Sequence, residues 1–212
     1  MDKNETKWLT LSLKLILIGI VFWVIKPRYL THFILPEHNF FNAYGFELIG
    51  TILIMTGLVI TRHVYPFYYT FFAEGFAAVV FVLNVLNFFL RDNEIFRQIN
   101  CYDTFFMSLC LFFVSKLLEN GLRYFGAPEL ARKWRYFAII IFFGFTIPFY
   151  MITTMFVCNL VQWESAKITG KLVGLSIPFL ITIASAMIVY IYYLVKSFGF
   201  LQQIQRENEE AK

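Results

Sequence analysis

Two oppositely charged residues, Lys14 and Glu74, lie inside long apolar segments of this sequence. Glu74 is the only charged residue in "PFYYTFFAEGFAAVVFVLNVLNFFL" (66–90). An ionised side chain near the centre of a bilayer costs a few kcal/mol and therefore requires a partner. Both residues lie just before the midpoints of their segments, so as helical residues they fall at nearly the same depth. We therefore predict a Lys14–Glu74 ion pair; the alternative is a protonated Glu74 and a Lys14 that extends to the interface.

The segment that contains Glu74 also carries a stripe of small and polar residues. The positions that share one helical face are Ala73, Ala77, Val80, Asn84 and Asn87. Small residues let helices approach closely, and buried asparagines form hydrogen bonds between helices. The stripe therefore predicts a face turned toward protein or a hydrated path, with the phenylalanine-rich side toward lipid.

Two segments nearer the C-terminus share the pattern Gly-x-[Ser/Thr]-Ile-Pro-Phe, as "GFTIPF" (144–149) and "GLSIPF" (174–179). A proline inside a helix removes one hydrogen bond and frees the carbonyl four residues earlier. Interrupted helices in opposed repeats often frame transport sites. The predicted substrate or ion lining at these helix breaks consists of Gly144, Thr146, Pro148, Gly174, Ser176 and Pro178. The alternative is a pair of tolerated kinks.

The residue types needed for catalysis or for a cofactor do not come together in the sequence. The three histidines fall in loops or at the ends of apolar segments, and a metal site formed by His32, Glu37 and His38 is the weaker alternative to no metal. Phosphate-binding glycine loops and Gly-x-Ser-x-Gly elbows are missing. We therefore expect no cofactor, no metal and no catalytic residues. Of the cysteines, Cys110 is expected to pack as a small apolar residue, and a bond between Cys101 and Cys158 is left open.

The elements that must position these residues follow from the composition. The chain has 212 residues, of which 59% are hydrophobic and 15% charged, and the apolar residues are concentrated in blocks. A span of roughly 20 residues crosses a bilayer as a helix. We therefore predict an all-α, polytopic integral membrane protein, a bundle of six transmembrane helices in a single domain covering residues 1–212. The predicted spans are 8–26, 45–61, 66–90, 104–123, 136–160 and 172–195.

The lysines and arginines beside these spans predict the orientation. Their excess on the side of the N-terminus, residues 62–65 and residues 123–135 places both termini in the cytoplasm, with 196–212 as a short tail. Glu119 is spaced to meet Lys116 and Arg123 on one helix face. Pro128 is expected to begin a short interfacial helix. The side chains predicted to contact lipid headgroups are Arg123, Arg132, Lys133 and Arg135.

The functions consistent with this pattern are those of a small membrane subunit. The net charge of +4 is too dispersed for nucleic acid, so membrane lipids and other membrane subunits, including copies of this chain, are the expected partners. In size and helix count the chain is similar to substrate-capture subunits of energy-coupling factor transporters, although the first span lacks their Ala-x-x-x-Ala docking motif. We expect an oligomer or larger complex, in the plasma (inner) membrane, for passage or recognition of a small solute or ion. The alternatives are an accessory or sensor subunit without transport and, less favoured, a lipid-modifying enzyme.

Overall fold

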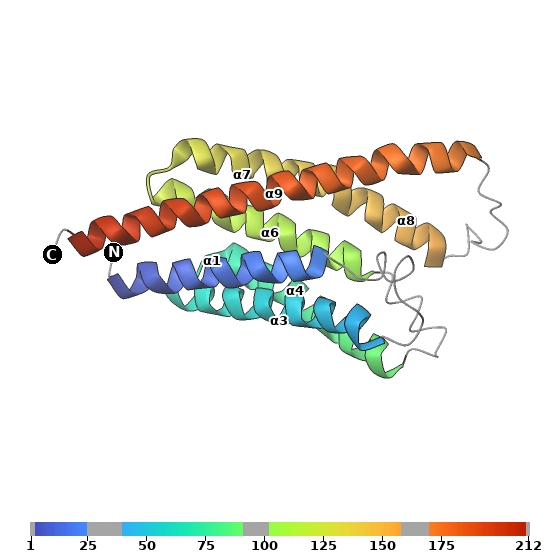
Figure 1. Ribbon diagram of the computed structural model, residues 1–212, viewed down its shortest axis with the longest axis horizontal. Coiled ribbons are helices and arrows are strands. Elements are labelled where there is room, and N and C mark those ends of the chain that lie inside the picture. Colours follow the sequence, from blue (N-terminus) through green and yellow to red (C-terminus); the bar gives the residue numbers. More distant parts are fainter. Residues whose placement is uncertain (1–2, 25–39, 91–101, 158–169, 211–212) are drawn as a thin grey trace.

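The computed structural model describes residues 3–24, 40–90, 102–157 and 170–210, which form six helices (Figure 1). Five of them are α1 (Lys3–Val24), α3 (Phe40–Val64), α4 (Tyr68–Phe89), α6 (Asp103–Tyr124) and α9 (Gly170–Glu210). The other one is continuous and consists of α7 (Pro128–Ile141), the π-helical turn η1 (Phe142–Thr146) and α8 (Ile147–Val157). The predicted all-α architecture is confirmed for these residues.

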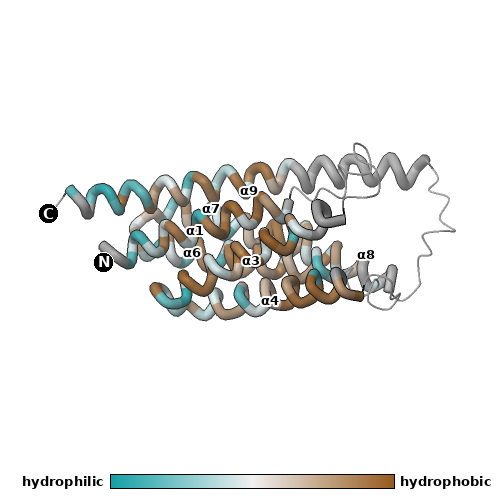
Figure 2. Tube along the Cα trace, turned by 60° about the horizontal axis from the view of Figure 1, so that its bottom comes forward, coloured by the Kyte–Doolittle hydropathy of each residue, from teal (hydrophilic) through white to brown (hydrophobic). Residues whose placement is uncertain are grey.

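Five segments of the described residues are long and apolar enough to cross a membrane. They are Glu5–Trp23, Gly45–Val64, Tyr68–Leu86, Asp103–Tyr124 and Pro128–Met151. The sixth predicted span falls in α9, whose side chains the structure describes from residue 185 onward. Figure 2 shows hydrophobic residues along the middle of the helices and hydrophilic residues toward the end that holds both chain ends. The protein is therefore a multi-pass integral membrane protein.

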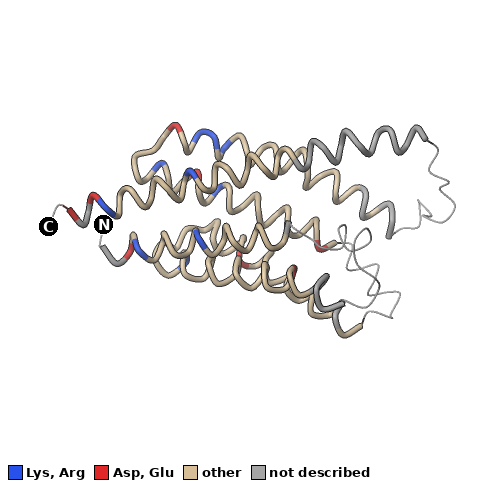
Figure 3. The backbone as a smooth tube through the Cα atoms, viewed as in Figure 1, with Lys and Arg blue, Asp and Glu red and all other residues tan. Residues whose placement is uncertain are grey.

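The helices pack mainly on their neighbours in the chain. α1 contacts α3, α3 contacts α4, α4 contacts α6 and α6 contacts α7, while α9 returns to pack on α1. The first turn of α1 and the last turn of α9 lie at the same end of the elongated bundle (Figure 1). Figure 3 colours the backbone trace by residue type, and the positions of the coloured lysines and arginines lie toward this end. We call it the basic end.

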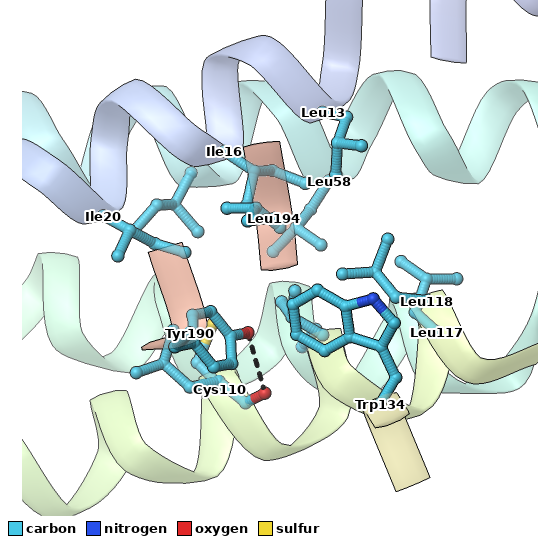
Figure 4. Packing of buried hydrophobic residues seen from close by; sticks show 14 of the residues in the cluster. Leu13, Ile16, Ile20, Leu58, Cys110, Leu117, Leu118, Trp134, Tyr190 and Leu194 are labelled. Carbon is cyan, nitrogen blue, oxygen red and sulfur yellow. Dashed lines mark hydrogen bonds between the residues drawn. The ribbon is translucent and has the colours of Figure 1, made fainter. Parts of the chain in front are cut away.

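The core lies where α1, α3, α6, α7 and α9 meet. Figure 4 shows its side chains, among them Ile16 from α1, Leu58 from α3, Cys110 from α6, Trp134 from α7 and Tyr190 from α9. All five are almost fully buried. The expected apolar packing of Cys110 is confirmed. The Tyr190 hydroxyl donates to the Leu111 carbonyl at 3.4 Å, so this polar atom has a partner inside the core.

α1 and α3 approach each other more closely than ordinary side chains would allow. A Cβ atom added to Gly50 would lie 2.7 Å from the Gly19 carbonyl oxygen and 2.9 Å from the Trp23 amide nitrogen. A Cβ atom added to Gly57 would lie 2.7 Å from the Ser12 carbonyl oxygen. Backbone atoms cannot move aside as a side chain can. The antiparallel pairs Gly19–Gly50 and Ser12–Gly57 therefore set the small spacing of these two helices.

The turn between α6 and α7 leads into a longer helix than the short interfacial helix predicted to begin at Pro128. Gly126 has a φ of 81°, a conformation that favours glycine, and the Ala127 amide donates to the Leu122 carbonyl at 2.8 Å. Pro128 then begins α7, as predicted. However, α7 continues through η1 into α8, so the short interfacial helix expected here is instead the beginning of the fifth membrane-crossing helix.

Candidate functional site

Glu74 has a different partner from the predicted one. Its carboxylate lies 2.9 Å from the Arg62 guanidinium, which comes from the last turn of α3. The side chain of Glu74 is 18% exposed and that of Arg62 is 41% exposed. Lys14 is exposed on α1 and makes no ion pair with a described residue. The predicted Lys14–Glu74 pair is therefore wrong for this structure.

The error came from the assumption that Arg62 belongs to a loop. α3 extends to Val64 and α4 begins at Tyr68, so the two helices form a tight antiparallel hairpin. In this hairpin Arg62 reaches along α4 toward Glu74 from the basic end. Lys14 and Glu74 lie at similar depths in their helices, but a long arginine side chain at a helix end can extend to the same depth.

The small and polar stripe of α4 faces protein, as predicted. Ala73, Ala77 and Val80 are 0% exposed and Asn84 is 3% exposed. Both polar atoms of the Asn84 amide are buried without a hydrogen-bond partner among the described residues. The side chain of Asn87 lies outside the described ones. Because buried amides are normally hydrogen-bonded, Asn84 is a polar group that a bound water or solute would satisfy.

The first proline motif distorts its helix without interrupting it. The π-helical turn Phe142–Thr146 lies directly before Pro148, and the Ile147 amide donates to the Phe142 carbonyl, five residues back. Proline removes one amide and crowds the preceding turn, which accounts for the wider turn at this point. Gly144 is exposed, whereas the buried Thr146 donates through its hydroxyl to the Ile141 carbonyl at 3.2 Å.

The second proline motif does not repeat this geometry. The backbone of α9 is α-helical from Gly170 to Glu210, through Gly174, Ser176 and Pro178. The side chains of these three residues lie outside the described ones. Similar sequence letters thus give a π-helical turn in one helix and a continuous α-helix in the other. A substrate lining shared by the two motifs stays a prediction.

The basic end of α6 holds a cluster of three cations around one buried carboxylate. Glu119, whose side chain is 6% exposed, lies 2.7 Å from Arg135, 2.9 Å from Arg123 and 3.0 Å from Lys116. The spacing along α6 predicted the contacts with Lys116 and Arg123. The contact with Arg135 joins α6 to α7, and the sequence analysis missed it. We call these four residues the Glu119 cluster.

The four residues predicted to contact headgroups all lie near this cluster in the chain. The side chains of Arg123, Arg132, Lys133 and Arg135 are exposed at the basic end of the bundle. Arg123 and Arg135 are bound to Glu119, while Arg132 and Lys133 make no ion pair with a described residue. Contact with lipid headgroups stays a prediction for all four.

One small cavity lies inside the described bundle. A cavity of about 50 Å³ lies near the basic end, and apolar side chains form most of its lining. Its polar edge is formed by Ser12 and Thr61, whose hydroxyls are hydrogen-bonded to each other, and Ser12 also donates to the Gly57 carbonyl at 2.7 Å. Such a volume holds a few water molecules and no larger solute.

Tyr65, in the turn between α3 and α4, also lines this cavity. Burial raises the pKa of the Tyr65 hydroxyl, and a hydrogen bond with Tyr124 raises this pKa further. Tyr65 is therefore neutral throughout the physiological pH range.

Two buried acidic residues were missed by the sequence analysis. Glu47 in α3 is 0% exposed and Asp103 at the start of α6 is 5% exposed. Asp103 accepts hydrogen bonds from the amide and the hydroxyl of Thr104. The sequence does signal Glu47, because this acidic residue lies inside the predicted span 45–61, as Glu74 does in the predicted span 66–90. Among the described residues, no three histidine, cysteine, aspartate or glutamate side chains gather as metal ligands.

Several predicted features lie outside the described residues. They are Cys101, Cys158 and the connection that contains His32, Glu37 and His38. Comparisons with protein-family models, with curated proteins and with solved structures found no match to this chain.

Proposed function

We propose that this protein is a subunit of a membrane assembly, formed with copies of itself or with other membrane proteins, and that its own bundle is not a conduction path. The observation that supports this proposal is the packed interior. Buried apolar side chains of α1, α3 and α6 pack against one another, and the cavity of about 50 Å³ among them is lined mainly by apolar side chains. A channel through the bundle would require polar side chains in line through both leaflets.

The distribution of polar groups supports the same proposal. The Arg62–Glu74 pair and the Glu119 cluster lie at the basic end, where they join α3 to α4 and α6 to α7. Their carboxylates are occupied by cations and are not aligned along a path. An accessory, scaffolding or sensing role within a larger assembly fits a bundle of this kind better than transport by one copy.

The orientation that we propose places both termini and the basic end in the cytoplasm, with the plasma (inner) membrane as the location. This proposal is supported by the lysines and arginines that are coloured in Figure 3, which lie toward the end that holds both chain ends. Positive charge is retained on the cytoplasmic side when short loops are inserted.

The experiment combines two measurements on the purified full-length protein. Native mass spectrometry from a mild detergent is expected to show an oligomer or a co-purifying membrane protein. Liposomes that contain the protein are expected to show ion and solute flux equal to that of protein-free liposomes. An ion or solute flux that increases in proportion to the amount of monomeric protein in the liposomes would contradict the proposal.

Recognition or passage of a small solute or ion is the second candidate. It is favoured by Asn84, whose buried amide has no hydrogen-bond partner among the described residues, and by the π-helical turn before Pro148. π-Helical turns are frequent at functional sites. If Asn84 binds a solute, that solute should raise the thermal stability of the wild-type protein and should not raise that of Asn84→Leu.

A further inference from the structure

An open groove of about 560 Å³ lies at the basic end, between the first turns of α7 and the C-terminal half of α9. The side chains that matter for its chemistry are Glu129, Leu130 and Lys133 from α7 and Tyr193, Lys196 and Phe200 from α9. One wall thus comes from each helix, and each wall contributes one lysine.

Aromatic side chains between α7 and α9 hold the two walls of this groove in place. The rings of Trp134 and Tyr190 lie 5.0 Å apart, and those of Phe137 and Tyr193 lie 5.2 Å apart. The Trp134 indole also donates to the Ser197 hydroxyl at 2.8 Å. Because these large rings separate the helices at the depth of the core, the space beyond them opens toward the basic end. The groove is therefore a consequence of packing.

The two lysines of the groove differ from the neighbouring cations. Lys116, Arg123 and Arg135 share the carboxylate of Glu119. Lys133 and Lys196 make no ion pair with a described carboxylate, although Glu129 also lines the groove. Two lysines against Glu129 leave the lining with one net positive charge, and the Glu207 carboxylate lies beside it, where it accepts from the lining residue Gln203 at 2.8 Å.

The backbone at the start of α7 adds to this positive potential. The residue before the helix, Ala127, provides no side-chain cap, and Pro128 has no amide hydrogen. The amides of Glu129 and Leu130, in the first turn, have no intrahelical acceptor. The beginning of a helix carries a partial positive charge and attracts phosphate groups. This helix end and both lysines line the same groove.

The remaining side chains of the groove are suited to the carbon atoms of a lipid. Tyr193, Lys196 and Phe200 are spaced three and four residues apart, so they lie on one face of α9. Leu130 lies on the opposite wall. The groove thus combines positive charge with apolar surface at the end of membrane-crossing helices, which is the depth of lipid headgroups.

We propose that this groove binds an anionic phospholipid. The phosphate lies between Lys133 and Lys196, near the start of α7, and the glycerol and upper acyl carbons contact Leu130, Tyr193 and Phe200. Lipid binding at this groove is non-covalent and does not depend on whether the protein conducts a solute. It can therefore be tested separately from the proposed function.

The test measures lipid retention by the full-length protein in nanodiscs and by native mass spectrometry. The probes are phosphatidylglycerol and, for comparison, phosphatidylcholine. Wild type is expected to retain phosphatidylglycerol in preference to phosphatidylcholine. The variant K133Q/K196Q should bind phosphatidylglycerol about 30-fold more weakly, because each lysine near an anionic lipid contributes about 1 kcal/mol. The variant K133R/K196R should retain binding.

The matched control is K7Q/R206Q, which removes the same charge from exposed positions of α1 and α9 outside the groove. It should bind phosphatidylglycerol like the wild type. Equal losses in the control and in K133Q/K196Q would overturn the proposal, because general surface charge would then explain binding. Unchanged binding by K133Q/K196Q would also overturn it. Displacement of the lipid by millimolar glycerol phosphate would show a soluble phosphate site in place of a lipid site.

Discussion

Glu74 and Glu119 are accommodated at the end of an apolar bundle in related ways. Each carboxylate is more buried than its cationic partners: the side chain of Glu74 is 18% exposed against 41% for Arg62, and that of Glu119 is 6% exposed against 53% for Arg123. The long cations thus reach inward from the interface while they keep contact with water or headgroups. In the single Arg62–Glu74 pair, loss of the cation therefore leaves a poorly solvated anion, whereas loss of the acid leaves one cation that can turn outward.

This asymmetry gives a prediction for the Arg62–Glu74 pair. Arg62→Gln should lower the stability of the protein in detergent more than Glu74→Gln does, and the double variant should recover part of the loss. For a partly exposed pair the loss in Glu74→Gln should be about 1 kcal/mol or less. Thermal unfolding of the four proteins provides the measurement. Lys14→Gln is the control and should leave the unfolding temperature unchanged; a coupling of Lys14 with Glu74 would restore the partner inferred from sequence.

The Glu119 cluster gives a second prediction. Glu119→Gln should destabilise the protein by about 2 kcal/mol, because three cations then repel one another without a carboxylate between them. The conservative control is Glu210→Gln, which removes the same charge at an exposed position and should change the stability by less than about 0.5 kcal/mol. Equal unfolding temperatures for the two variants would mean that Glu119 does not hold α6 and α7 together.

Among the elements, the α1–α3 pair depends most directly on residue size. Gly50→Ala should destabilise the protein by about 2 kcal/mol, because its new Cβ would lie within 2.9 Å of backbone atoms of α1. Gly75→Ala in α4 is the matched control, since a Cβ at Gly75 meets no atom within 4 Å. The control should be neutral or slightly stabilising, because alanine favours a helix over glycine. Similar unfolding temperatures for the two variants would refute the close contact.

The six helices were predictable from sequence because each apolar block is long enough to cross a bilayer. The buried stripe of α4 and the contacts of Glu119 within α6 were predictable too, because both follow from the helical repeat. The contacts between helices were harder to predict from the sequence. The small residues Ser12, Gly19, Gly50 and Gly57 are spaced alike on two spans, and this signal was not used.

The partners of Glu74 and Arg135 depend on where helices end and on how hairpins close. The hydrophobic pattern does not determine where a helix ends or how a hairpin closes, because helix boundaries are the feature that it defines least exactly. The π-helical turn before Pro148 shows the same limit. The sequence indicated a distortion at both proline motifs, but α9 is continuous through its own motif, so the local letters alone do not decide the backbone geometry.

At the scale of the whole molecule, the positions of the cations and of the chain ends lead to one prediction of orientation. Because the lysines and arginines that are coloured in Figure 3 lie toward the end that holds both chain ends, both ends should remain in the cytoplasm. Lys7→Cys and Arg206→Cys place thiols at exposed positions on α1 and α9. A membrane-impermeant maleimide added to intact cells should label neither new thiol above the wild-type background.

The same reagent should label both thiols after the membrane is opened, and this step separates a protected thiol from a buried one. Labelling of both in intact cells would invert the proposed orientation while leaving the six-helix bundle intact. Labelling of only one would mean that the chain crosses the membrane an odd number of times between Lys7 and Arg206. That result would remove α9, or one of the five apolar candidates, from the set of spanning helices, and it would require the two chain ends to lie on opposite sides of the bilayer.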